Sequence, residues 1–146
     1  MSYRPKYFAL NELVPPHILA ERGERAWALM DDRILRGADW LREKFGPAII
    51  NGKFGGKVFT ESGLRDPFTT TGAKWSQHKF GRAVDMKFLK VTAKEVYDYI
   101  IRNPGEAREN GITTVEDIAF TGTWLHADCR ALPDTFPDNG ILVVKP

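Results

Sequence analysis

The chain has few of the residues that carry redox or metal chemistry: one cysteine and three histidines among 146 residues. A single cysteine excludes an intramolecular disulfide and suits synthesis in a reducing compartment. We interpret Cys129, which follows Asp128 on an expected strand, as a packing residue rather than a nucleophile. Because histidine is so scarce, the positions of two of the three carry most of the functional information.

Long apolar runs are also missing. No stretch of about eighteen apolar residues occurs, so the sequence predicts no membrane span. The basic residues near the start, Arg4 and Lys6, are not followed by an apolar segment, and we therefore expect synthesis in the cytoplasm without a signal peptide. The length suits one domain, residues 1–146, and we expect a monomer.

Neither sign of charge dominates, since the formal net charge is only +2. This excess is too small to predict nucleic-acid binding, which requires clustered Lys and Arg. It is compatible with binding to an anionic polymer such as a bacterial cell wall, and equally with a charge that only aids solubility.

Two segments predict helices. The first is an apolar stripe with steps of three and four residues, and Gly46-Pro47 supplies its stop. In the second, Thr92-Ala93-Lys94-Glu95 resembles a capping box and predicts a helix that runs to about Arg102. The stripe of the first helix consists of Trp27, Met30, Ile34, Ala38, Leu41 and Phe45.

Short apolar or alternating segments predict strands, and Asn51-Gly52 indicates a tight turn. The polar stretch from Ser62 to Ser76 predicts a loop. These elements favour an α+β fold with a small, mainly antiparallel sheet flanked by helices. The expected strands are residues 48–50, 58–60, 82–89, 118–120, 124–129 and 141–144.

Three side chains from separate segments could meet at one site. Alternation in the strand at 82–89 leaves Asp85 opposite the apolar face, and alternation in 124–129 puts His126 on the less apolar face. His78 precedes the first of these strands in a loop. One carboxylate and two imidazoles form a three-ligand zinc site that keeps the fourth position open for water.

The segment Ser76-x-His78-x-x-Gly81-x-Ala83-x-Asp85 resembles, at every fixed position, a signature of the M15 zinc peptidases. Trp124-Leu125-His126-Ala127-Asp128 is similar to the second signature of that family, and Ser62-Gly63-Leu64-Arg65 to its Ser-Gly-Tyr-Arg segment. The resemblance covers about residues 48 to 130. The family includes D-Ala-D-Ala carboxypeptidases and phage endolysins, and its fold resembles the hedgehog signalling domain.

The resemblance implies that His78, Asp85 and His126 bind Zn²⁺. It also implies that Arg65 holds a substrate carboxylate or a developing oxyanion, although a fold-stabilising arginine is the alternative. Ser76 is expected either to hydrogen-bond a ligand or substrate, or to serve only as a turn residue.

One position departs from the family pattern. Many M15 enzymes have a glutamate three residues before the third ligand, where it acts as general base, and this chain has Thr123 there. Asp128 is the nearest replacement, and its alternative roles are to orient His126 or to pair with Arg130. Glu116 and Asp117 are weaker candidates for the base.

The resemblance implies a zinc metallopeptidase that cuts stem peptides or crossbridges of bacterial peptidoglycan. A phage endolysin that acts on the cell wall is one such enzyme. One alternative is a catalytically silent, zinc-stabilised binding domain or virion structural domain of the same fold. Another is a metal-dependent hydrolase of a different amide or ester.

Overall fold

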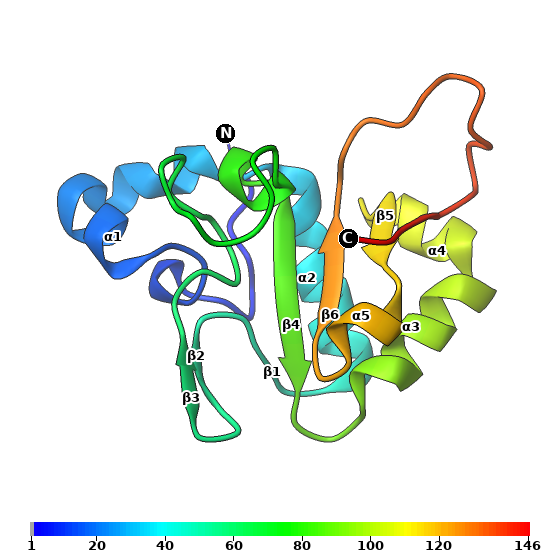
Figure 1. Ribbon diagram of the computed structural model, residues 1–146, viewed down its shortest axis with the longest axis horizontal. Helices are drawn as coiled ribbons and strands as arrows, with labels where there is room; N and C mark the ends of the chain where they lie inside the picture. Colours follow the sequence, from blue (N-terminus) through cyan, green and yellow to red (C-terminus); the bar gives the residue numbers. More distant parts are fainter. Residues whose placement is uncertain (1) are drawn as a thin grey trace.

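A five-stranded sheet forms the centre of the structure, a computed structural model that describes residues 2–146 (Figure 1). Its order is β1-β4-β6-β5-β7, and every neighbouring pair is antiparallel except β5 and β7. This arrangement confirms the expected α+β class. The strands are β1 (Ala48–Ile49), β4 (Ala83–Phe88), β5 (Thr114–Glu116), β6 (Leu125–Asp128) and β7 (Leu142–Val144).

A separate hairpin lies beside β4 (Figure 1). It consists of β2 (Gly52–Phe54) and β3 (Lys57–Phe59). Its turn is at Gly55-Gly56, which have φ values of 58° and 79° and therefore need glycine. The expected tight turn at Asn51-Gly52 was placed wrongly, because Gly52 already pairs in β2.

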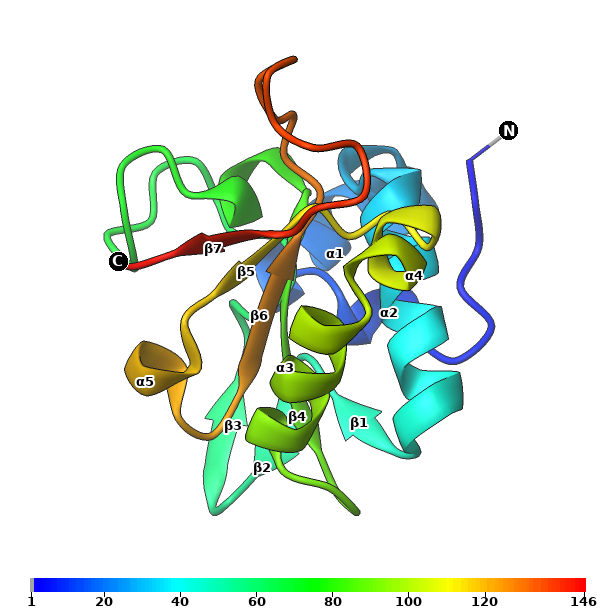
Figure 2. The same cartoon turned by 90° about the vertical axis from the view of Figure 1, so that its right-hand side faces the viewer.

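Helices cover the apolar face of the sheet (Figure 2). The longest, α2 (Asp32–Phe45), begins where Asp31 caps the backbone N–H of Arg33 and ends at Gly46. The stripe expected from Trp27 is therefore interrupted at Met30, whose backbone is extended. The other helices are η1 (Leu10–Glu12), α1 (Pro16–Arg22), η2 (Gly23–Leu29), η3 (Gln77–Phe80), α3 (Ala93–Arg102), α4 (Pro104–Glu109) and α5 (Ile118–Thr121).

The capping box at the start of α3 is confirmed, since Thr92 and Glu95 each accept a hydrogen bond from the other's backbone N–H. The strand expected at 118–120 is wrong. This segment is the short helix α5, which begins where the Asp117 carboxylate accepts from the N–H of Ala119. None of the helices within residues 2–146 is long and apolar enough to cross a membrane.

Strand β4 is buried on both faces. Val84, Met86 and Phe88 belong to the core that the helices cover. The opposite face, with Asp85 and Lys87, lies under the chain between Ile50 and Ser62, because the Lys87 ammonium donates to the carbonyl of Ile50 and to the hydroxyl of Ser62. Two charged side chains are thus enclosed on one face of one strand.

Candidate metal centre

A tight turn delivers His78 to the start of β4. The Ser76 hydroxyl caps η3 by accepting the backbone N–H of His78 at 3.3 Å. Gly81 ends η3 with φ 66°, and a Cβ there would lie 1.8 Å from the carbonyl oxygen of Leu29. Only glycine fits both the conformation and this close approach. Ser76 therefore has the turn role that was one of its two expected roles.

Asp85 and His126 face each other across the β4–β6 pair, where the register is Asp85↔His126. Directly opposed residues in an antiparallel pair project from the same face of the sheet. The two family-like segments, some forty residues apart in the chain, thus bring their carboxylate and imidazole together as the sequence predicts.

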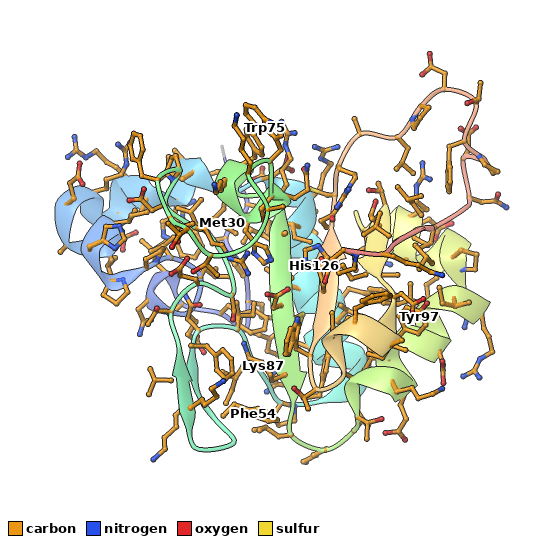
Figure 3. The ribbon with its side chains drawn as sticks, in the orientation of Figure 1. Met30, Phe54, Trp75, Lys87, Tyr97 and His126 are labelled. Atoms are coloured by element: carbon orange, nitrogen blue, oxygen red, sulfur yellow. The ribbon has the colours of Figure 1, made fainter. Side chains whose placement is uncertain are left out.

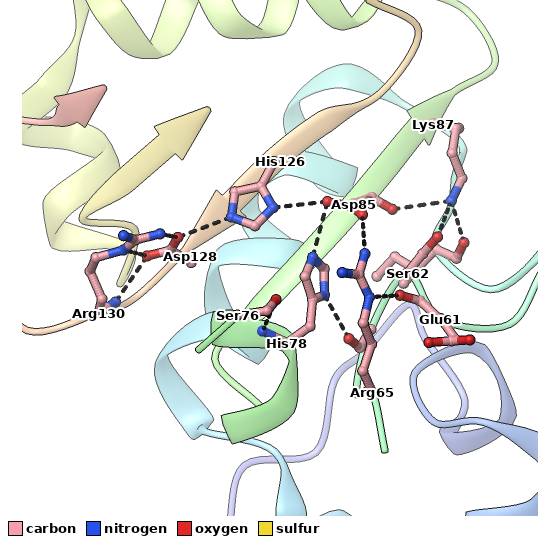
Figure 4. Close-up of polar contacts among 12 residues, drawn as sticks. Glu61, Ser62, Arg65, Ser76, His78, Asp85, Lys87, His126, Asp128 and Arg130 are labelled. Atoms are coloured by element: carbon pink, nitrogen blue, oxygen red, sulfur yellow. Dashed lines mark hydrogen bonds and ion pairs between the residues drawn. The ribbon is translucent and has the colours of Figure 1, made fainter. Parts of the chain in front are cut away.

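The three expected ligands converge on one point (Figure 4). The Oδ1 atom of Asp85 is 3.2 Å from Nε2 of His78 and 2.9 Å from Nδ1 of His126. One ligand atom from each residue lies within 4.8 Å of the other two, and all three residues are buried. Zinc bonds of about 2.0–2.1 Å place tetrahedral ligand atoms about 3.3 Å apart, so these spacings suit a metal ion.

The outer nitrogen of each imidazole is fixed by an acceptor. Nδ1 of His78 lies 2.7 Å from the carbonyl oxygen of Gly63, and Nε2 of His126 lies 3.0 Å from Oδ2 of Asp128. When each outer nitrogen donates to its acceptor, both inner nitrogens have a free lone pair that faces the Asp85 carboxylate. Three acceptors around one point require either extra protons or a cation between them. The His78, Asp85 and His126 group can therefore hold a metal ion.

The pKa values show how strongly these groups attract positive charge. Burial lowers the pKa of His126, but hydrogen bonds to Asp128 and Asp85 outweigh it and raise the pKa to about 9. Burial raises the pKa of Asp85, but His78 and His126 hold it far below its usual range. In the metal-free protein a proton on His126 partly supplies the missing positive charge.

Asp128 is enclosed and fully engaged. Its side chain has no exposed surface. Oδ1 accepts from the backbone N–H and Nε of Arg130, and Oδ2 accepts from Arg130 at 2.5 Å and faces Nε2 of His126. Burial raises the pKa of Asp128, but these partners lower it overall. Both structural roles considered for Asp128, orientation of His126 and pairing with Arg130, are present.

Arg65 lies beside the second oxygen of Asp85. Its guanidinium donates to Oδ2 of Asp85 at 3.3 Å, and its Nε donates to the carbonyl of Glu61 at 2.8 Å. It thereby leaves Oδ1 of Asp85 to face the two imidazoles. The arginine also lines the cavity next to the site, where its remaining N–H groups can meet a ligand.

Lys87 is a second buried charge two residues beyond Asp85 (Figure 3). Its Nζ donates to the carbonyls of Ile50 and Asp85 and to the hydroxyl of Ser62, at 2.5, 3.2 and 2.8 Å. It also lies 4.2 Å from the centre of the Phe59 ring. Burial lowers the pKa of Lys87 to about 8.

Two cavities meet at the ligands. One, of about 400 Å³, contains all three of them and extends to Glu116 and Arg130. The other, of about 260 Å³, lies on the side of the β2–β3 hairpin and shares Arg65, Thr71, Asp85 and Trp124 with the first. A ligand could therefore extend to both sides of the metal-binding group.

A third cavity, of about 370 Å³, contains none of the expected ligands and lies beside His17. The exposed His17 side chain makes a hydrogen bond with Asp66, with 2.9 Å between Nε2 and Oδ2.

The sequence did not single out Lys87 as part of the site's surroundings, and it ranked Glu116 below Asp128 as a candidate base. Glu116 lines the larger cavity, and Lys87 lies in the wall of the smaller one. The alternation of β4 already put Lys87 on the face of Asp85. No local pattern marks 114–116 as a strand, so the place of Glu116 depended on long-range pairing.

In comparisons with known proteins, no protein-family model, curated protein or solved structure matches the chain. The functional interpretation therefore depends on the residues of the site and on the sequence resemblance.

Proposed function

We propose that the protein is a zinc-dependent peptidase that hydrolyses short peptide bonds in bacterial peptidoglycan, similar to the M15 peptidases. The observation that carries this proposal is the convergence of Nε2 of His78, Oδ1 of Asp85 and Nδ1 of His126 beside open cavities. Two imidazoles and one carboxylate favour zinc over calcium or magnesium, which prefer sets of oxygen ligands. When bound, zinc would acidify a water molecule and polarise the scissile carbonyl.

The surrounding residues have separate tasks in this proposal. Asp128 holds the N–H of His126 and thereby fixes the orientation of the ligand ring. Arg65 keeps the Asp85 carboxylate in place and offers its cationic fork to a substrate carboxylate or oxyanion. Ser76 acts through the turn that positions His78.

The choice of peptidoglycan follows from the resemblance and is supported by charge. The larger cavity contains Arg65, Arg130 and Lys145, which suit the carboxylates of stem peptides. Action on the cell wall, as a phage lysin or as a virion-associated enzyme, belongs to this proposal.

The test is mass spectrometry of soluble fragments released from purified peptidoglycan by the zinc-loaded protein. New peptide termini that disappear on chelation and in His78→Ala support the proposal, and their masses identify the bond. A Glu21→Gln variant, changed at an exposed position of α1, serves as the matched control. If a folded protein with one bound zinc releases no fragments from several wall types, the proposal is wrong. The alternative of a zinc-stabilised binding or structural domain is then favoured.

A further inference from the structure

Neither of the two positions considered first from the sequence, Thr123 and Asp128, supplies a proton-transfer residue for this reaction. Thr123 stands where many M15 enzymes have glutamate, and Asp128 is not among the residues that line the cavity. All described partners of Asp128 are protein groups, and the side chain is inaccessible to solvent. A base must reach both a water molecule and the leaving nitrogen, and Asp128 reaches neither.

Glu116 lies on the same face of the sheet as the metal ligands. The β5–β6 register pairs Thr114 with Asp128 and Val115 with Ala127, and one further step places Glu116 opposite His126. Since β6 pairs on its other side with β4, Asp85, His126 and Glu116 form a row across three adjacent strands. Directly opposed residues project from one face, so Glu116 flanks His126 on the side away from Asp85.

The surroundings of Glu116 leave its carboxylate available. Among the residues that line the larger cavity, only Asp85 and Glu116 have acidic side chains. Asp85 is a metal ligand, whereas Glu116 is half-buried and makes no side-chain hydrogen bond or ion pair within residues 2–146. Its neighbour Asp117 is used as the cap of α5. Glu116 is thus the free carboxylate of the cavity.

We propose that Glu116 is the proton-transfer residue of this site, an assignment that rests on the proposed peptidase function. Its carboxylate accepts a proton from the water whose oxygen bonds to the scissile carbonyl carbon. The same proton passes to the amide nitrogen as the carbon–nitrogen bond breaks, which regenerates the carboxylate.

The test compares Glu116→Gln with wild type and with the matched surface variant Glu21→Gln, each loaded with zinc. The first readout does not depend on turnover: calorimetric binding of acetohydroxamic acid, which loses a proton to a nearby carboxylate when it binds zinc as an anion. Glu116→Gln should weaken this binding about tenfold or more, because a hydrogen bond to a charged group is lost. Zinc content should stay at the wild-type value, and Glu21→Gln should bind like wild type.

The second readout is peptide release from peptidoglycan, which Glu116→Gln should slow by about 10²- to 10⁴-fold. If hydroxamate binding is the same in Glu116→Gln and wild type, or does not occur in wild type, the assignment is wrong whatever the activity. If hydroxamate binding depends on Glu116 but wild type releases no fragments, the assignment stands and peptidoglycan is the wrong substrate.

Discussion

Asp85 and Lys87 are both buried charges on one face of β4, but their surroundings differ in kind. Lys87 donates to three oxygen acceptors, so its donors are matched within the protein. Asp85 faces one ring nitrogen of each of two histidines, and these three residues can together hold a metal ion. The polar cluster around Lys87 is thus complete within the protein, whereas a metal ion would complete the cluster around Asp85, two residues earlier on β4.

The largest expected effect is stabilisation by zinc, which should depend on Asp85 and not on Lys87. Zinc should raise the free energy of unfolding by about 4 kcal/mol when free zinc exceeds its Kd a thousandfold. Chelation or Asp85→Asn should abolish the gain, while Lys87→Met should keep it, since Lys87 supplies no ligand atom. Urea denaturation with and without zinc measures this. A gain below about 1 kcal/mol in wild type would contradict a specific site.

The three residues that can hold a metal ion could be predicted from the sequence because each lies in a short local pattern. Strand alternation and the turn at Gly81 specify where His78, Asp85 and His126 project, and the β4–β6 register agrees. The burial of Lys87 could not be predicted in this way. It depends on the chain from Ile50 to Ser62, which covers what alternation indicates as an open face.

The fold shows the same division between local and long-range information. The α3 capping box and the Gly46 stop are local and were predicted. The pairing of β5 with β6 and β7 is not local, and the three-residue β5 has too few positions to show a period. Residues 118–120 are apolar enough for a strand, but the cap at Asp117 starts a helix there.

The second effect concerns Asp128, which orients the ring of His126. Asp128→Asn should weaken zinc binding about 10- to 100-fold, because the His126 ring loses its charged partner and Arg130 loses an ion pair. Competition with a chromophoric chelator measures the affinity. Asp98→Asn, which removes a carboxylate paired with Lys94 on the surface of α3, is the control and should change nothing. Equal affinities for Asp128→Asn and wild type would show that Asp128 does not prepare the site.

The third expected effect is a pH dependence of stability that Lys87 causes in the metal-free protein. The folded pKa of Lys87, about 8, is below its ordinary value of 10.5. Between these values the unfolded chain binds the additional proton, so the contribution of Lys87 to stability rises with pH. His126 acts oppositely between pH 6.5 and 9, because its folded pKa is raised.

The difference between wild type and Lys87→Met isolates the lysine from His126. Relative to the variant, wild type should gain up to about 2 kcal/mol of unfolding free energy between pH 7.5 and 9.5. Urea denaturation across this range is the measurement. Parallel pH curves for the two proteins would show that Lys87 titrates normally and is not held in a desolvated position.

The smallest effect concerns the ring that faces Lys87. The Phe59 ring stabilises the ammonium group only while Lys87 is charged, at a distance of 4.2 Å. Phe59→Leu should therefore destabilise the metal-free protein by about 1 kcal/mol more at pH 7.5 than at pH 9.5. Phe54→Leu, in the same hairpin, loses a ring without this contact, and its cost should not change with pH. If both variants respond to pH alike, the three oxygen acceptors alone hold the Lys87 charge, and the hairpin contributes packing without electrostatic stabilisation.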